Sequence, residues 1–320
     1  MSSGTGTSRN APGDDRRETT LRVGRRTLDL PRPDKVLFPG DGITKEDLAR
    51  HYQAVASRAL PHLRGRPLMM ERHPDGIDGR PLMQKNAPDY FPDWITRSTQ
   101  AKEGGEVVHV VCDDAATLVY LAVQASITQH RWLSRADHPD HPDVLIVDLD
   151  PAPDGDFAEV RWAARQVCTL CDDLGLPVRL MTTGSRGLHV LLPLDAKADY
   201  DTVREFAKAL ADTLAARHPD RLTTEPRKDA RKGRLYLDVQ RNAYAQTAVA
   251  PYSVRARPGA PVATPVSRDA LDDPDLRPDG WTIRTFDSYL EAEDPWSGDT
   301  WRGHSASAAH RRLRKVAGEE

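Results

Sequence analysis

Apolar and polar positions along the chain predict a mixture of strands and helices. The run VLIVDLD at 144–150 is almost continuously apolar, which is typical of a buried strand. Residues 157–174 place their apolar side chains at helical spacing, and PVRLMTT then returns to a strand pattern. The segment GSRG separates that strand from another, LHVLLPL. This part of the chain therefore predicts a βαβ-like unit followed by a further strand.

Other elements follow from the same periodicities. Thr44 is a good N-cap for a helix with Asp47 at its third position, and a second helix is expected over 116–130. A β-hairpin is expected in RPLMMERHPDGIDGRPLMQKN, a helix in YDTVREFAKALADTLAARH and an alternating strand in GRLYLDVQRN. The C-terminal third is rich in Pro and Asp, so we expect ordered coil there, with WTIRTF as a short strand.

No flexible linker stands out along the chain. We expect a disordered polar leader at 1–20, one compact two-lobed catalytic domain at 21–300, and a basic tail at 301–320.

Composition narrows the class of protein. With 38% hydrophobic and 29% charged residues, the 320-residue chain is expected to be soluble, and no apolar run is long enough to span a membrane. The first 20 residues lack the apolar core of a signal peptide, and three cysteines are too few for a disulfide scaffold. A cytoplasmic protein is therefore expected. Cys168 and Cys171 form a lone CxxC at helical spacing, which favours core packing over zinc or redox chemistry.

Carboxylates gather at the ends of two predicted strands. Asp148 and Asp150 share the strand face opposite Leu145, Val147 and Leu149, about 6.5 Å apart along the chain. Such residues can simply cap a helix or face water. Asp238 also lies opposite the apolar side chains of its strand, and three converging carboxylates would repel one another unless cations lie between them. Hard oxygen ligands suit two Mg²⁺ or Mn²⁺ ions for phosphoryl transfer.

Phosphate-binding groups surround these strands in the sequence. TTGSRGLHV offers the Thr183 and Ser185 hydroxyls, glycine amides, Arg186 and His189, although GSRG alone is also compatible with a plain hairpin. The net charge is only −3, so a nucleic-acid surface must come from local clustering. PRKDARKGR is such a cluster, although a solvated loop explains it equally well. Arg255 and Arg257, at strand spacing, match a triphosphate or a DNA backbone.

The motifs together resemble the polymerase domain of bacterial DNA ligase D, in the archaeo-eukaryotic primase superfamily. The resemblance rests on DKVLFPGDGITKEDLARHY, QKNAPDYFPDW, LVYLAVQASITQHRWLSR, VDLDP, GSRGLHVLLPL, YLDVQRN and TAVAPYSVRARPGAPVATP, in the family order. It implies an α+β, primase-like fold of two lobes with mixed β-sheets flanked by helices. It also implies a nucleotidyltransferase that adds NTPs or dNTPs to a primer 3′-OH on gapped or broken DNA during non-homologous end joining. Ku and a separate DNA ligase are the implied partners, in the bacterial nucleoid.

The resemblance also implies roles for individual residues. Asp148, Asp150 and Asp238 match the metal-binding aspartates. The first metal, shared by all three, would activate the 3′-OH, and the second, held by Asp148 and Asp150, would neutralise pyrophosphate. Ser185 and His189, with Arg186 and Thr183 beside them, match positions that bind the triphosphate, and His130 matches a position near the nucleotide sugar. Arg231, Arg255 and Arg257 match basic positions around triphosphate and primer. Lys35 and Lys45 match lysines that bind a downstream 5′-phosphate.

Two features depart from the family pattern. Leu82 and Met83 stand where relatives often carry an aromatic pair that packs on the template, which puts base stacking there in doubt. The sequence shows no ligase nucleotidyl-lysine motif, so we expect polymerisation without sealing. Two other functions remain open: a non-catalytic DNA-end scaffold that recruits a ligase, and a two-metal nuclease, which needs no triphosphate pocket.

Overall fold

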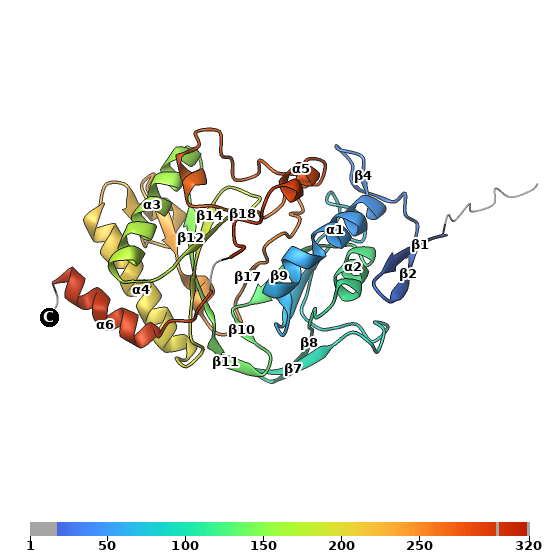
Figure 1. The fold of residues 1–320 in the computed structure, drawn as a ribbon, viewed down its shortest axis with the longest axis horizontal. Helices are drawn as coiled ribbons and strands as arrows, with labels where there is room; N and C mark the ends of the chain where they lie inside the picture. The colour runs from blue at the N-terminus through green and yellow to red at the C-terminus, as the bar shows by residue number, and fades with distance from the viewer. Residues whose placement is uncertain (1–17, 299–300, 319–320) are drawn as a thin grey trace, which may run out of the picture.

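The computed structural model describes residues 18–298 and 301–318, which form two lobes side by side (Figure 1). Most of the predicted leader lies outside the described residues, and its last residues, from Glu18, belong to a strand. One lobe is built on a four-stranded sheet and the other on a six-stranded sheet. The secondary structure is mixed α+β, as the sequence predicts.

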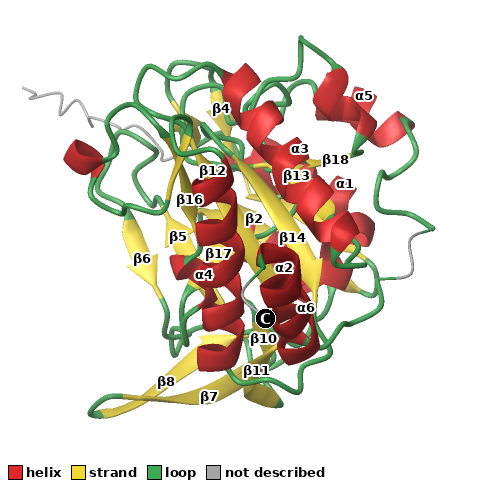
Figure 2. Cartoon of the chain, turned by 90° about the vertical axis from the view of Figure 1, so that its left-hand side faces the viewer, coloured by secondary structure: helices red, strands yellow, loops and turns green. Residues whose placement is uncertain are grey.

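The six-stranded sheet carries the acidic strand at its centre. Its order is β15-β16-β12-β14-β13-β18, with helices α3 and α4 packed against it and α6 lying along α4 (Figure 2). Because β14 lies between β12 and β13, the predicted βαβ-like unit is a split one. The bounds are β12 (Val144–Asp150), α3 (Phe157–Asp173), β13 (Arg179–Thr182), β14 (Leu188–Pro193), α4 (Tyr200–Arg217), β15 (Leu222–Thr223), β16 (Leu235–Asp238), β18 (Pro265–Val266) and α6 (Ala306–Ala317).

The other lobe holds the four-stranded sheet β17-β9-β5-β6 and helices α1 and α2, which pack on each other. Helix α1 begins after Thr44, whose side chain forms a capping box with Asp47 as predicted. The bounds are β1 (Glu18–Val23), β2 (Arg26–Pro31), β3 (Val36–Phe38), β4 (Ile43–Thr44), α1 (Lys45–Leu63), β5 (Leu68–Arg72), β6 (Leu82–Gln84), β7 (Arg97–Lys102), β8 (Gly105–Val110), α2 (Ala115–Val123), β9 (Ser126–Trp132), β10 (Ser134–Arg135), β11 (His138–Pro142) and β17 (Thr247–Val249).

The residues of β12 divide between two apolar cores. Leu145, Val147 and Leu149 pack under α3 and α4 in the core of the larger sheet. Val144 and Ile146 face the other way, into a smaller core that includes residues of β17 from the other sheet. Because side chains alternate, Asp148 and Asp150 continue this second face toward the junction between the lobes. The strand is therefore apolar on both faces where it is enclosed and acidic where it leaves the core.

Helix α3 confirms the interpretation of the CxxC pair. Cys168 and Cys171 are free, fully buried and packed in the core of the larger sheet. Burial raises the pKa of the Cys168 thiol to about 11 and raises that of Cys171 further. Both thiols are therefore protonated core residues near neutral pH.

Several sequence predictions need correction. The helix expected over 116–130 ends at Val123, because Ala125 takes a left-handed φ of 56° and the chain continues as β9. The segment that follows forms the β10-β11 hairpin. WTIRTF makes only one isolated bridge, at Thr282, before α5 (Phe286–Glu291) begins.

Outside β17, β18, α5 and α6, the C-terminal third is coil, as predicted, with the short helical turn η3 (Asp269–Asp272). The short turns η1 (Lys228–Ala230) and η2 (Gln240–Asn242) precede it. Within the predicted tail, α6 is capped by Ser305 and buries Leu313 in the core of the six-stranded sheet. No helix among the described residues has the length and apolarity needed to cross a membrane.

Candidate active site

Three strands of the larger sheet bring acidic groups and a histidine together at the junction between the lobes. Asp148 of β12 lies directly opposite Asp238 of β16 on one side and His189 of β14 on the other. Asp150 follows on the same face, opposite Tyr236. Side chains that face each other across antiparallel strands have Cβ atoms about 5 Å apart, so like charges there repel.

The carboxylates respond to one another and to His189. Burial and the charges of Asp148 and Asp238 raise the pKa of Asp150. Burial also raises the pKa of Asp238, and the Asp148 charge adds to that shift. Asp148 behaves differently. Burial alone would raise its pKa, but His189, whose Nε2 lies 3.4 Å from Asp148 Oδ2, together with Arg241 and Arg255, lowers the Asp148 pKa overall. Ionisation is therefore disfavoured at Asp150 and Asp238 and favoured at Asp148.

Only two of the three predicted metal ligands line the same cavity. Asp148 and Asp150 face a cavity of about 460 Å³ between the lobes, whereas Asp238 lines a neighbouring hollow beside Arg241. Asp238 Oδ1 accepts a hydrogen bond from the backbone amide of Gln240 at 2.8 Å. Within the described parts of the chain, no group of three His, Cys, Asp or Glu side chains converges as a metal site. The backbone thus aligns the three carboxylates, but the Asp238 side chain points into the next hollow.

The donor set still fits a divalent cation. The groups are hard carboxylate oxygens, and the raised pKa values of Asp150 and Asp238 record a repulsion that a bound cation removes. Asp238 would have to give up its hydrogen bond to the Gln240 amide in order to hold a cation together with the other two carboxylates.

The turn between β13 and β14 packs tightly against the acidic strand. Gly187 has no room for a side chain, because a Cβ there would lie 2.4 Å from the Leu149 carbonyl oxygen. Gly184 has φ +62°, and its Cβ would lie 2.8 Å from Cγ of Arg255. The Thr183 hydroxyl closes the turn by donating to the Gly187 carbonyl at 3.1 Å and accepting from its amide at 3.2 Å. Thr183 therefore holds the turn, and Ser185 beside it lines the cavity.

Arginines of the cavity are held by backbone carbonyls. Arg186 donates to the Pro151 and Ala152 carbonyls at 2.8 and 2.9 Å, which fixes the loop after β12 against the turn. Arg255 donates to the Thr183 carbonyl at 2.6 Å, while its Nε is buried without a hydrogen-bond partner. Arg231 packs its guanidinium 3.9 Å from the centre of the Tyr236 ring. These contacts leave the positive charges largely uncompensated.

The cavity is strongly cationic as a whole. Two carboxylates, Asp148 and Asp150, are the acidic residues among its described lining, which also includes His130 and His189. A site with many guanidiniums and few carboxylates favours a polyanionic ligand such as a triphosphate. The cationic lining residues are Arg186, Lys228, Arg231, Arg234, Arg241, Arg255 and Arg257.

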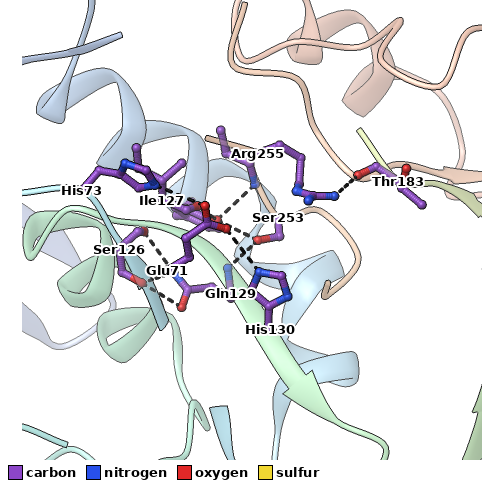
Figure 3. Close-up of polar contacts among 11 residues, drawn as sticks. Glu71, His73, Ser126, Ile127, Gln129, His130, Thr183, Ser253 and Arg255 are labelled. Carbon is purple, nitrogen blue, oxygen red and sulfur yellow. Dashed lines mark hydrogen bonds and ion pairs between the residues drawn. The ribbon is translucent and has the colours of Figure 1, made fainter. Parts of the chain in front are cut away.

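His130 enters the cavity from the other lobe, on strand β9 rather than on the predicted helix. Its Nε2 lies 3.3 Å from Oε2 of Glu71, and His73 Nε2 lies 3.2 Å from Oε1 of the same carboxylate (Figure 3). Burial would raise the pKa of Glu71, but the hydrogen bonds from His130 and His73 hold it well below its usual range. Burial lowers the pKa of His130, so its imidazole is neutral at pH 7.

Several cavity residues were missed or left open by the sequence. Arg241 belongs to the YLDVQRN motif, three residues after Asp238, and that short spacing was the available signal. Lys228 and Arg234 lie in the basic run whose solvated-loop interpretation had equal weight. Glu71, which contacts His130 but does not line the cavity, gave no signal, since β5 and β9 are distant in sequence.

The two lysines assigned to a 5′-phosphate lie together at the start of α1, away from the cavity. The Lys45 amide donates to the Lys35 carbonyl at 2.9 Å. Burial lowers the pKa of Lys45 to about 8, with further lowering by Arg32 and Lys35. The Lys45 ammonium donates to the Pro31 carbonyl, and the Lys35 ammonium donates to the Pro74 carbonyl and lies 3.7 Å from Asp75. The structure thus brings both lysines into one positive cluster.

The predicted departure at the template position is visible on strand β6. Leu82 and Met83 are 49% and 54% exposed, and Met83 lines the edge of the cavity. These side chains are apolar surface without the flat ring faces on which bases stack.

Comparisons with known proteins agree with this geometry. The family model described as LigD, primase-polymerase domain, matches residues 44–296. The chain is 34% identical over 256 residues to the multifunctional non-homologous end joining DNA repair protein LigD of Mycobacterium tuberculosis, covering 78% of this chain and 34% of that protein. It is 32% identical over 286 residues to LigD of Pseudomonas aeruginosa, covering 88% of this chain and 34% of that protein.

A solved structure of a relative has a similar fold. The polymerase domain of Mycobacterium tuberculosis ligase D, in complex with DNA, matches with a TM-score of 0.79 at 30% identity, covering 91% of this chain and 98% of that one. The archaeo-eukaryotic primase fold expected from the motifs is therefore confirmed. The chain spans about a third of the length of the curated relatives. It belongs to the LigD primase-polymerase domain family of non-homologous end joining repair.

Proposed function

We propose that this chain is a primase-like polymerase that extends a primer 3′-OH with NTPs or dNTPs on gapped or broken DNA during end joining. The family implies a nucleotidyltransferase. The observation that carries the proposal is one cavity in which the Asp148 and Asp150 carboxylates face a wall of arginines and one lysine, Lys228. A metal-binding edge beside a polyanion-binding wall is what transfer of a nucleotidyl group from a triphosphate requires.

The carboxylates would hold divalent cations, Mg²⁺ or Mn²⁺, as the family suggests. Asp148 and Asp150 supply oxygens from the cavity wall, and Asp238 adds another after leaving the Gln240 amide. Two bound cations would lower the pKa of the primer hydroxyl and neutralise the departing pyrophosphate. His189, 3.4 Å from Asp148, keeps that carboxylate ionised and ready to bind metal.

The cationic wall would hold the triphosphate. Ser185 and His189 offer hydrogen-bonding groups, and Arg186, Arg255 and Arg257 offer positively charged donors. The buried and unpartnered Nε of Arg255 is a donor that a phosphate oxygen can satisfy. Neutral His130, anchored by Glu71, faces the same cavity and suits the sugar of the incoming nucleotide.

Lys35 and Lys45 support binding of a downstream 5′-phosphate. Their cluster lies at the N-terminus of α1, where backbone amides and the helix dipole also attract anions. DNA is the proposed substrate surface, with Ku and a separate ligase as proposed partners in repair.

Primer extension on gapped, 5′-phosphorylated DNA tests the proposal, with Mn²⁺ against Mg²⁺ and NTPs against dNTPs. Wild type should add nucleotides, and Asp238→Asn should lose at least 90% of the rate. Asp220→Asn, an exposed carboxylate outside both hollows, is the matched control and should keep the full rate. Tight binding of DNA ends without incorporation would favour the scaffold instead, and DNA degradation without added nucleotide would favour the nuclease.

A further inference from the structure

A second cationic cavity lies at the junction between the lobes and shares no lining residue with the first. Its volume is about 390 Å³. It is lined by His62 at the end of α1, Arg131 of β9, the start of β12 at Val144 and the end of β14 at Pro193. Trp296, from the C-terminal segment, adds an aromatic wall. Nothing in the proposed polymerase chemistry uses these residues.

Positive charge exceeds negative charge in this cavity. Asp143 is the single carboxylate among its lining residues in the described parts of the chain. Arg66 Nη2 lies 2.5 Å from Asp143 Oδ1, and Arg135 Nε lies 3.0 Å from Oδ2, so two guanidiniums share one carboxylate. Arg131 donates a hydrogen bond to the His62 carbonyl at 2.9 Å and forms no ion pair with a carboxylate among the described residues.

Two of these guanidiniums are deeply buried and incompletely hydrogen-bonded. Arg66 and Arg131 are each 2% exposed. The Nε of each is buried without a hydrogen-bond partner among the described residues. Burial and the neighbouring arginines lower the pKa of Arg131 to about 9. A buried cation with spare donors is costly unless an anion approaches it, and Arg131 has no carboxylate paired with it among the described residues.

We propose that this cavity binds a phosphate-sized oxyanion between Arg66, Arg131 and Arg135. Charged donors arranged around a small cavity match the oxygens of a tetrahedral anion. Arg135 has a 43% exposed side chain and stands at the opening. Arg179 also lines the cavity, where it donates to the Trp296 carbonyl and lies 4.3 Å from the centre of the Trp301 ring. Since residues of both lobes line the cavity, a bound anion would stabilise the contact between the lobes.

Free inorganic phosphate and a phosphate of the DNA backbone share this chemistry, and two measurements separate them. The first is thermal unfolding of the full chain without metal, with chloride replaced by phosphate at a constant ionic strength of about 0.15 M. The unfolding temperature of the wild type should be about 3 °C higher in phosphate than in chloride. Arg135→Gln keeps the buried Arg66–Asp143 pair, so it should fold but lose most of that gain.

Two control variants locate the effect. Arg257→Gln removes a cation from the first cavity, and Arg50→Gln removes an exposed cation from α1; both should keep the phosphate gain. Loss of the gain in Arg257→Gln with retention in Arg135→Gln would overturn the proposal. Absence of any gain in wild type would overturn it as well.

The second measurement is equilibrium binding of labelled duplex DNA at the same ionic strength. About tenfold weaker binding by Arg135→Gln than by Arg50→Gln would identify a backbone phosphate as the occupant, through loss of one charged contact. If Arg135→Gln and Arg50→Gln bind DNA equally well, but Arg135→Gln has lost the rise in unfolding temperature in phosphate, the occupant is a free anion.

Discussion

Replacing Asp150 by Asn should stabilise the metal-free protein. Asp150 and Asp148 share one face of β12, two residues apart, which places them about 6.5 Å from each other. Two charges at that distance repel by about 2.6 kcal/mol at an effective dielectric constant of about 20 and by about 0.6 kcal/mol in water. Burial acts in the same direction as this repulsion, and Arg231 and Arg186 offset only part of the two effects, so the pKa of Asp150 is raised overall. A net gain of about 1–2 kcal/mol is therefore expected for Asp150→Asn.

The sign of the pH dependence follows from the raised pKa. A folded state that holds its proton more tightly than the unfolded chain loses stability as pH rises through that window. Wild type should thus be destabilised at pH 7.5, and the penalty should vanish below about pH 4, where the carboxyl is protonated in both states. The difference from Asp150→Asn should shrink in the same range.

Thermal unfolding in EDTA at pH 7.5 and at low pH measures this effect. A gain of 1–2 kcal/mol corresponds to a rise of about 1.5–3 °C in the unfolding temperature for a chain of this size. Asp220→Asn, at an exposed turn, should leave the unfolding temperature within about 1 °C of wild type. An Asp150→Asn protein that is no more stable than wild type at pH 7.5 would refute the inferred repulsion.

Three further predictions concern the residues around the cavity. Gly187→Ala should lower the free energy of unfolding in urea by about 2–3 kcal/mol, since the new Cβ would meet the Leu149 carbonyl; an unchanged midpoint would contradict this. Glu71→Gln should lower the His130 pKa further in an NMR titration and raise the nucleotide KM severalfold, because the imidazole loses a charged partner; an unmoved pKa would exclude this positioning role. A Lys35→Ala/Lys45→Ala double variant should bind gapped DNA equally with and without the 5′-phosphate, whereas wild type should prefer the phosphorylated form in fluorescence anisotropy.

The sequence predicted the elements whose pattern is local. The acidic strand, helix α3 and the capped start of α1 follow from alternation, helical spacing and one capping residue. The helix expected to run to His130 was wrong, because a single left-handed residue, Ala125, turned an apolar helix into a strand. Periodicity does not separate a buried helix from a buried strand over so short a segment.

The site was less predictable than the fold. Strand alternation placed Asp148, Asp150 and Asp238 on one face correctly, but the orientation of the Asp238 side chain depends on a hydrogen bond to the Gln240 amide. Glu71 reaches His130 only through the register between β5 and β9. Such contacts arise when strands pair, so no local pattern reveals them.

Nucleotide incorporation by an Asp148→Asn variant tests the central claim most directly. Asp148 lies between Asp238 and His189 on neighbouring strands, so the substitution removes the central carboxylate of the site. Extension of a labelled primer on gapped DNA with Mn²⁺ should fall at least a thousandfold in Asp148→Asn, with DNA affinity unchanged. A variant that keeps even a tenth of the wild-type rate would contradict the assignment of this cavity as the polymerase active site.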